Sequence, residues 1–273
     1  MGSISWITPA LAGAMMGAML VFPREAAAAA LQALIDFSNG VLPGLLPFSV
    51  CALLVTAGRS LPTPLLAALA LPGGSPTGAR LFQDAHLSPG TARKIAACTG
   101  VMSPMFFLYT LSSWLNDPRK GVLLLAAHLA AALLAGCFFK GKIRGRLSLP
   151  ELTISQALGQ SAQAMGTVAA CVVLGAVAAR MIGCALPGMP PMALSVIQCL
   201  QEVTAGMKAL ISLSVPLPVI AALTSFTGLS ILLQNAVFWK KNGLSLFSLA
   251  KIACLRAILA FLLCAVLEHL AGL

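Results

Sequence analysis

Two uninterrupted apolar stretches restrict the fold of this chain more than any other feature. Residues 122–139 carry no charged side chain, and residues 244–270 form a longer apolar run that includes Lys251 and Arg256. A helix of about 20 apolar residues crosses the hydrocarbon core of a bilayer. With 59% hydrophobic and 9% charged residues, the chain has too few charges for a soluble domain and is too apolar for a disordered one. We therefore predict an all-α polytopic membrane protein.

Positive charge concentrates in short segments between the apolar runs. The chain has 17 Lys and Arg against 7 Asp and Glu, and four of the cations fall within the seven residues 140–146. Cytoplasmic loops of membrane proteins carry such an excess of Lys and Arg. We therefore predict that residues 139–165 form a basic cytoplasmic loop followed by an amphipathic surface helix. Nucleic acid is not an expected partner, because no basic stripe interleaved with aromatic residues is present.

The cysteines and histidines show no pattern typical of metal binding or disulfide bonding. None of the eight cysteines forms a CxxC pair, and the three histidines are scattered. Structural metal sites and disulfide frameworks need clustered spacing. The HExxH, GxSxG and P-loop motifs are missing as well. We therefore expect no metal, no cofactor, no catalytic residues and no enzymatic activity.

Two regions contain apolar pieces that are too short to cross a bilayer. Residues 65–85 are interrupted by the Gly- and Pro-rich segment 72–78, and residues 218–239 by the Ser-, Thr- and Gly-containing segment 224–230. Unpaired backbone groups cannot face lipid, so such breaks must be buried in protein or line a wet cavity. We predict a broken, re-entrant-like helix in each region in place of one straight membrane-spanning helix.

Short sequence matches relate the two halves of the chain. Cys51-x-x-x-Val-Thr-Ala-Gly58 recurs as Cys199-x-x-x-Val-Thr-Ala-Gly206, and Pro64-x-x-Ala-Ala-Leu recurs from Pro218. These matches occur in the same order and flank the predicted breaks, which indicates two internal repeats. Whether the repeats are parallel or inverted is left open by the sequence.

The matches divide the chain into four parts. The parts are an N-terminal span and amphipathic helix at 1–40, repeat 1 at 41–138, the basic loop and amphipathic helix at 139–165, and repeat 2 at 166–273. Repeat 1 contains the broken helix 65–85, and repeat 2 contains the broken helix 218–239.

Matched helix breaks predict a transport site. In transporters built from repeats, substrate lies between broken helices whose N-terminal N–H groups face the cavity. Arg80 follows the first break and offers a positive charge to a carboxylate. Its alternative roles are snorkelling or pairing with Asp84 one turn on. A carboxylate such as Glu202 costs about 2.5–3.5 kcal/mol at the centre of a membrane helix. Glu202 is therefore either a coupling group that takes up a proton or a structural partner.

Four segments together resemble the sporulation integral membrane proteins of the YlbJ/SpoVV type, which contain nucleoside-recognition or gate domains. Residues 41–48 (VLPGLLPF) resemble the entry to the family's first repeat, and residues 74–80 (GSPTGAR) resemble its Ser-Gly-Tyr-Pro-x-Gly-Ala-Lys loop. Residues 202–206 (EVTAG) resemble its Glu-x-Thr-x-Gly helix, and residues 225–234 its Phe-Gly-Gly-x-Ser-Val-x-x-Gln loop. Arg80 stands where the family has lysine, and the tyrosine is missing.

The resemblance implies a gate-domain fold similar to the core of concentrative nucleoside transporters. It implies a permease for a small organic anion, such as dipicolinic acid during sporulation, in the bacterial cell membrane or outer forespore membrane. The alternatives are a transporter of nucleosides or other small solutes, and a non-transporting scaffold in a spore-maturation complex. Expected partners are the anionic substrate, the lipid bilayer, and further copies of the chain or other spore membrane proteins. The predicted substrate-binding residues are Gly74, Ser75, Thr77, Gly78, Arg80, Glu202, Thr227, Gly228, Ser230 and Gln234.

Overall fold

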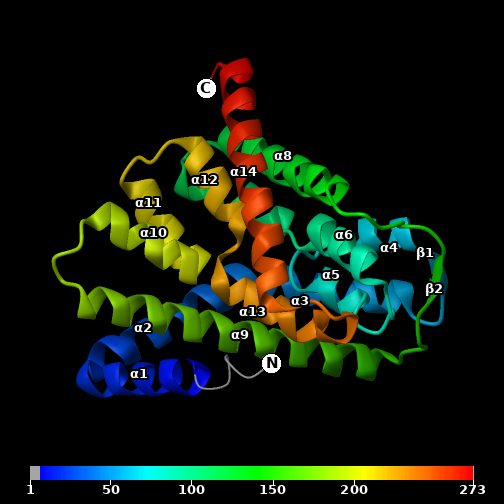
Figure 1. Ribbon diagram of the computed structural model, residues 1–273, viewed down its shortest axis with the longest axis horizontal. Helices are drawn as coiled ribbons and strands as arrows, with labels where there is room; N and C mark the ends of the chain where they lie inside the picture. The colour runs from blue at the N-terminus through cyan, green and yellow to red at the C-terminus, as the bar shows by residue number, and fades with distance from the viewer. Residues whose placement is uncertain (1–6, 273) are drawn as a thin grey trace.

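The structure is a computed structural model that describes residues 7–272, nearly all of them in helices and the turns between them. Five helices are long and apolar enough to cross a membrane: Pro23–Thr56, Pro118–Cys137, Ile154–Ala185, Leu217–Asn242 and Leu246–Ala271. The chain is therefore an all-α, multi-pass membrane protein, as its apolar runs predict. Figure 1 shows the last of these helices, α14 (Leu246–Ala271), rising through the middle of the molecule. Residues 1–6 of the expected N-terminal span lie outside the described residues.

The N-terminal helices follow one another with little interruption. They are α1 (Ile7–Val21), α2 (Pro23–Asp36), the π-helical turn η1 (Phe37–Val41) and α3 (Leu42–Thr56). Pro43 and Pro47 cannot donate backbone hydrogen bonds. The helix widens just before them, where Leu42 N–H donates to Phe37 O. The expected boundary at residue 40 therefore falls inside one apolar helix, Pro23–Thr56.

The basic segment lies beside the end of α3. Strand β1 (Ser60–Pro62) pairs antiparallel with strand β2 (Arg146–Ser148), and Leu61 is opposite Leu147. Gly58 N–H donates to Pro150 O at 2.9 Å next to this pairing. The loop that follows α3 and the basic loop are therefore at the same end of the molecule.

Helix α9 is a single helix of 32 residues, Ile154–Ala185. The side chains of Thr153 and Gln156 form a capping box at its start. The amphipathic helix that we expected to end at residue 165 is therefore only the first part of α9. One glycine inside a helix costs only about 1 kcal/mol relative to alanine. Gly166 consequently leaves the helix intact, and a Cβ added to it would meet nothing within 4 Å.

The segment between β1 and α9 contains a helical hairpin, a broken helix and a long helix. The hairpin is α4 (Thr63–Ala70) and α5 (Thr77–Leu81), joined by residues 71–76. The broken helix is α6 (Pro89–Thr99), the non-helical residues 100–103, the π-helical η2 (Phe106–Leu111) and α7 (Ser112–Trp114). The long helix is α8 (Pro118–Cys137). The side chains of Ser88 and Asp117 accept backbone hydrogen bonds and cap α6 and α8.

The C-terminal part contains two pairs of short helices followed by the long helix α14. Glu202 separates α10 (Pro191–Gln201) from α11 (Val203–Ser212). Thr227 separates α12 (Leu217–Phe226) from α13 (Gly228–Trp239). The short helix η3 (Lys240–Asn242) then leads to α14. Thr227 has a φ of +73°, which side-chain-bearing residues rarely adopt. The matching segments 51–58 and 199–206 differ in conformation. The first ends α3, whereas the second runs across the turn between α10 and α11.

Helices α8 and α14 run in opposite directions between two ends of the molecule. Gly121, early in α8, lies against Phe107 and Ser112, whereas Gly136, late in α8, lies against Lys94. In α14 the order is reversed. Its early residues Leu249, Ile252 and Ala253 share a core cluster with Ile95 of α6, and its later residues Ala260 and Cys264 share one with Phe107.

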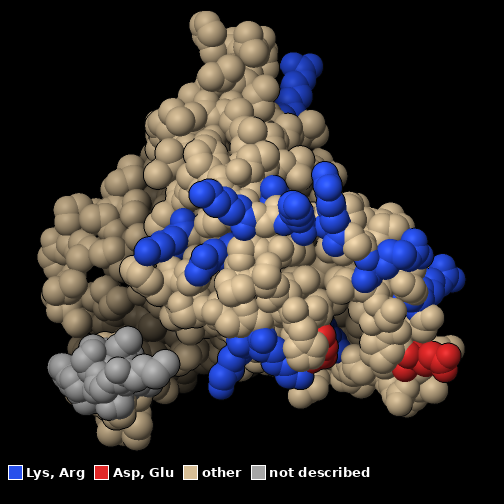
Figure 2. All heavy atoms as spheres, turned by 45° about the vertical axis from the view of Figure 1, so that its right-hand side comes forward, with Lys and Arg blue, Asp and Glu red and all other residues tan. Residues whose placement is uncertain are grey.

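One of these ends, which we call the basic end, holds more than half of the chain's 17 Lys and Arg residues, among them Arg59, Arg93, Lys94, Lys140, Lys142, Arg144, Arg146, Lys240 and Lys241. Loop 240–243 is attached there, because Leu87 N–H donates to Asn242 Oδ1 and Lys241 Nζ lies 2.6 Å from Asp84 Oδ1. Figure 2 shows Lys and Arg outnumbering Asp and Glu on the face turned toward the viewer.

Candidate functional site

The turns and breaks of the interrupted helices meet at one small cavity of about 50 Å³, here called the central cavity. Its walls come from η1, α3, α9, α13 and the segments around residues 75, 103 and 203. Most of the lining is apolar. The polar side chains that line it are those of Ser75, Ser103, Glu202, Thr204 and Gln234.

The turn between α4 and α5 is held against the non-helical segment 100–103. Ser75 N–H donates to Val101 O at 2.7 Å, and Ser75 Oγ donates to Asn235 Oδ1 at 2.7 Å. Gly74 has a φ of +61°, and a Cβ at this position would lie 2.7 Å from Ser103 Cα. Only glycine fits both the backbone conformation and the close approach.

Glu202 lies at the turn between α10 and α11. Its backbone is extended, with φ −138° and ψ 114°, and it separates the two helices. A Cβ on Gly206 would lie 2.6 Å from Cys199 Cβ, so α10 and α11 pack against each other immediately beyond the turn. The Glu202 side chain is buried, and one of its carboxylate oxygens accepts a hydrogen bond from the Thr204 hydroxyl.

The break between α12 and α13 lies directly against this turn. A Cβ on Gly228 would lie 3.2 Å from Cys199 O and 3.3 Å from Val203 N. Beyond the break, α13 carries Ser230 and Gln234, both buried. The Glu202 turn and the first turns of α13 therefore form one polar region beside the central cavity.

Two buried side chains that the sequence did not single out satisfy the backbone of residues 100–103. His128 Nε2 accepts the Met102 N–H at 3.0 Å, so the ring proton of a neutral His128 is on Nδ1 and is donated to Ser225 Oγ at 2.7 Å. Arg256 Nη1 donates to Gly100 O. Polar residues in the middle of apolar helices α8 and α14 were the available sequence signal, but the residues they contact lie far along the chain.

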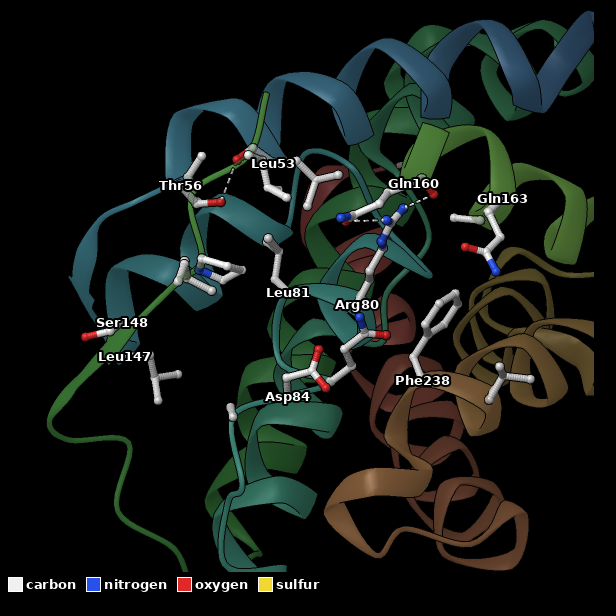
Figure 3. A pocket seen from close by; sticks show the side chains of 18 of the residues that line it. Leu53, Thr56, Arg80, Leu81, Asp84, Leu147, Ser148, Gln160, Gln163 and Phe238 are labelled. Carbon is white, nitrogen blue, oxygen red and sulfur yellow. Dashed lines mark hydrogen bonds between the residues drawn. The ribbon is translucent and has the colours of Figure 1, made fainter. Parts of the chain in front are cut away.

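A second cavity of about 650 Å³, here called the vestibule, lies toward the basic end. It is lined by residues of α3, α5, β2, α9 and α13, among them Thr56, Arg80, Asp84, Gln163 and Phe238. Figure 3 shows Arg80 directed at Gln160 of α9. Arg80 Nη1 donates to Gln160 O at 2.6 Å, and Nη2 donates to Gln160 Oε1 at 3.0 Å. Burial lowers the pKa of Arg80, yet an arginine remains charged in proteins.

The vestibule and the central cavity are consecutive along the same helices. Helix α9 contributes Ala164 and Thr167 to the vestibule and Val168 and Val172 to the central cavity. Helix α13 likewise contributes Phe238 to the first and Gln234 to the second, one turn apart.

A third cavity of about 280 Å³, here called the outer cavity, adjoins the central cavity on its other side. The two share Gly40, Val41, Phe106 and Thr204 as lining residues. The outer cavity also borders Trp114, which precedes α8 and therefore lies at the end opposite the basic end. Asp36 and Lys208 give this cavity charges of both signs. The three cavities thus form a row from one end of the molecule to the other.

The structure brings some of the predicted site residues together and separates others. Ser75, Glu202 and Gln234 line the central cavity, whereas Arg80 lines the vestibule. Gly74, Thr227, Gly228 and Ser230 belong to the backbone turns and helix start around the central cavity without lining it. Thr77 instead bonds to Gly73 O, and a Cβ on Gly78 would meet Thr99. Asp84 pairs with Lys241 rather than with Arg80.

Within residues 7–272, no group of three or more His, Cys, Asp or Glu side chains is placed to hold a metal ion. The arrangement is that of a multi-pass membrane protein with polar residues at helix turns around a small cavity. No protein-family model, curated protein or solved structure matches the chain.

Proposed function

We propose that this chain is a membrane transporter, in which a small solute passes between the two ends of the molecule through the three cavities. The observation that carries the proposal is the row of cavities, with polar residues of the helix breaks at its middle. A non-transporting scaffold has no need of such a row, because a single packed core would serve it equally well. In transporters of repeat architecture, broken helices place their binding site near the middle of the membrane.

The order and direction of the elements support two inverted repeats. Each proposed repeat is a helix, a helical hairpin, a broken helix and a second helix. In the first repeat these are α3, α4–α5, α6–α7 and α8, and in the second they are α9, α10–α11, α12–α13 and α14. Helix α8 runs toward the basic end and α14 runs away from it. This correspondence pairs the α4–α5 turn with the α10–α11 turn, whereas the sequence match of residues 51–58 with 199–206 pairs the end of α3 with the α10–α11 turn.

Alternating access follows from this arrangement. The central cavity of about 50 Å³ is too small for an organic solute, because one water molecule already occupies about 30 Å³ of liquid. We infer that movement of one repeat against the other opens the central cavity to the vestibule and to the outer cavity in turn. The contact between Ser75 and Asn235 belongs to the closed arrangement.

The charged side chains that line the three cavities favour some solutes over others. Arg80 in the vestibule favours the small organic anion expected from the resemblance, such as dipicolinate. The described residues that line the central cavity include Glu202 and no Lys, Arg or His, which disfavours an anion at that point. An uncharged, hydrogen-bonding solute such as a nucleoside is therefore the second candidate, favoured by the Glu202 and Gln234 side chains.

Uptake into proteoliposomes tests the transport proposal. Labelled dipicolinate and labelled nucleosides are offered to vesicles with purified protein and to protein-free vesicles. We expect one class to accumulate. Thr204→Trp, which fills the passage shared by the central and outer cavities, should reduce that uptake at least tenfold. Leu134→Trp on the exposed surface of α8 is the matched control and should transport normally. If neither class enters faster than in protein-free vesicles, a scaffold becomes the better explanation.

A further inference from the structure

The basic loop that follows α8 keeps its cations on its outer side. From Phe139 to Arg144, partly buried and exposed residues alternate one by one. Such alternation is that of an extended chain, in which successive side chains point to opposite sides. Phe139, Ile143 and Leu147 pack against the core cluster at the basic end. The exposed cations of this segment, here called the basic row, are Lys140, Lys142, Arg144 and Arg146.

Backbone contacts hold the basic row at both ends. Leu147 is opposite Leu61 in the β1–β2 pairing, and Thr63 N–H donates to Gly145 O at 3.0 Å. A Cβ on Gly141 would lie 2.7 Å from the carbonyl carbon of Gly90, so the other end of the row lies against the start of α6. Orientation in the membrane requires only that a loop be basic. This loop is in addition held in one conformation, so its charges form a fixed surface.

The protein itself does not neutralise the basic row. Among the described residues, the only ion pair joins Lys241 to Asp84, so no carboxylate oxygen lies within 4 Å of a nitrogen of the row. Arg146 donates to Ser60 O and, at 3.4 Å, to Ser60 Oγ, which are both uncharged acceptors. Helix α6 adds Arg93 and Lys94 nearby, since Lys94 lies against Gly136 at the end of α8. So many like charges close together favour an anionic partner from outside the chain.

The position of the basic row indicates which partner this is. Helix α8 is long and apolar enough to cross a membrane, and it ends at Cys137, just before Lys140. Leu134 and Phe138, four residues apart and therefore on one face of this helix end, are exposed apolar side chains. A phospholipid satisfies both surfaces, because its acyl chains cover the apolar face while its phosphate lies beside the cations. Clusters of Lys and Arg next to a membrane helix attract anionic lipids in this way.

We propose that the basic row, together with Arg93 and Lys94, binds the phosphate groups of anionic phospholipids such as phosphatidylglycerol in the leaflet at the basic end. The bound headgroups neutralise the row and hold the end of α8, the start of α6 and β2 at the membrane surface. The four residues of the row line none of the three cavities. The lipid surface is therefore separate from the proposed solute path and does not depend on the transport function.

Lipid-dependent stability of the purified protein tests this surface without any transport measurement. Thermal unfolding of delipidated protein in a neutral detergent is followed while phosphatidylglycerol, phosphatidylcholine or inorganic phosphate is added. We expect a saturable rise in Tm with phosphatidylglycerol alone, and salt should weaken it. The double variant Lys142→Gln, Arg144→Gln should lower the apparent affinity for phosphatidylglycerol about tenfold. The double variant Arg119→Gln, Lys120→Gln removes the same charge from the opposite end of α8, and this matched control should respond like the wild type.

Each outcome supports the lipid surface or overturns it. Equal stabilisation by phosphatidylglycerol and phosphatidylcholine overturns it, as does an unchanged phosphatidylglycerol response in Lys142→Gln, Arg144→Gln. An equal response to inorganic phosphate overturns it as well, because the row would then bind a soluble anion. If the double variant fails to fold, photoreactive phosphatidylglycerol is crosslinked to the wild-type protein in vesicles, and the attachment sites are located by mass spectrometry. Crosslinks at residues 93–94 or 138–146 support the proposal, and their absence from these residues overturns it.

Discussion

Ser75 and Asn235, which are 160 positions apart, are joined by a buried hydrogen bond in which Ser75 Oγ donates to Asn235 Oδ1 at 2.7 Å. Ser75 belongs to the turn between α4 and α5, and Asn235 follows the break between α12 and α13 by two turns. The contact therefore ties the interrupted segments of the two halves together beside the central cavity. Phe82 and Trp239 stack farther along, with ring centroids 6.4 Å apart, so α5 and α13 run side by side toward the basic end.

The Ser75–Asn235 contact should couple the two halves energetically. Ser75→Ala leaves a buried Asn235 oxygen without its donor, and we expect a loss of about 1–3 kcal/mol in the free energy of unfolding. The double variant Ser75→Ala, Asn235→Ala should lose less than the sum of the two single variants. Denaturant unfolding in detergent measures this double-mutant cycle, and strict additivity would show that the contact carries no energy.

Gly74 should tolerate no side chain. Gly74→Ala would place a methyl group 2.7 Å from Ser103 Cα at a position with positive φ, so folded yield and Tm should fall, with a cost of about 1–3 kcal/mol. Gly159→Ala in α9, where nothing lies within 4 Å, is the control. It should be neutral or slightly stabilising, because alanine favours helix. Equal Tm values for the two variants would contradict the packing argument.

His128 should be needed because its ring accepts a hydrogen bond from the Met102 N–H. His128→Leu leaves the Met102 N–H buried without a partner, and the expected cost is again about 1–3 kcal/mol. His128→Gln retains an acceptor and should recover part of the loss in a thermal unfolding experiment. If glutamine and leucine destabilise the protein equally, the hydrogen bond to the segment 100–103 is not what requires histidine.

Arg80 should matter for an anionic solute at the entrance rather than at the central cavity. Arg80→Gln retains donors for Gln160 and removes the charge, so KM for dipicolinate uptake should rise about tenfold while the maximal rate changes little. Uptake of an uncharged nucleoside is the internal control and should be unaffected. A KM for dipicolinate equal to that of the wild type would make Arg80 purely structural.

The basic end should face the cytoplasm, because it holds the cluster 140–146 together with Arg59, Lys94 and Lys241. Single cysteines at the exposed Lys142 and at Lys120, in a background without the eight native cysteines, report on the two ends. An impermeant thiol reagent added to intact cells should label Lys120→Cys and spare Lys142→Cys. The reverse labelling pattern would show that the basic end faces the outside of the cell.

Hydrophobic patterning by itself determined that this chain is a multi-pass helical membrane protein, because bilayer thickness fixes how many apolar residues a span needs. Composition also indicated turns at residues 72–78 and 224–230, since Gly74 and Gly228 adopt backbone conformations that are costly for other residues, but it did not indicate the interruption at residues 100–103 or the turn at Glu202. Such local conformational preferences act within a few residues and are readable from the chain. The extent of α9 was harder to place, because one glycine is too weak a signal to separate two helices.

Only the tertiary structure decided which interrupted segments share a cavity. Arg80 and Ser75 are five residues apart, yet one lines the vestibule and the other the central cavity, because α5 carries Arg80 toward α9. His128, Asn235 and Arg256 received partners from segments far away in the chain. Their roles depend on long-range packing of helices, in which each buried polar group must find a partner that no local pattern specifies.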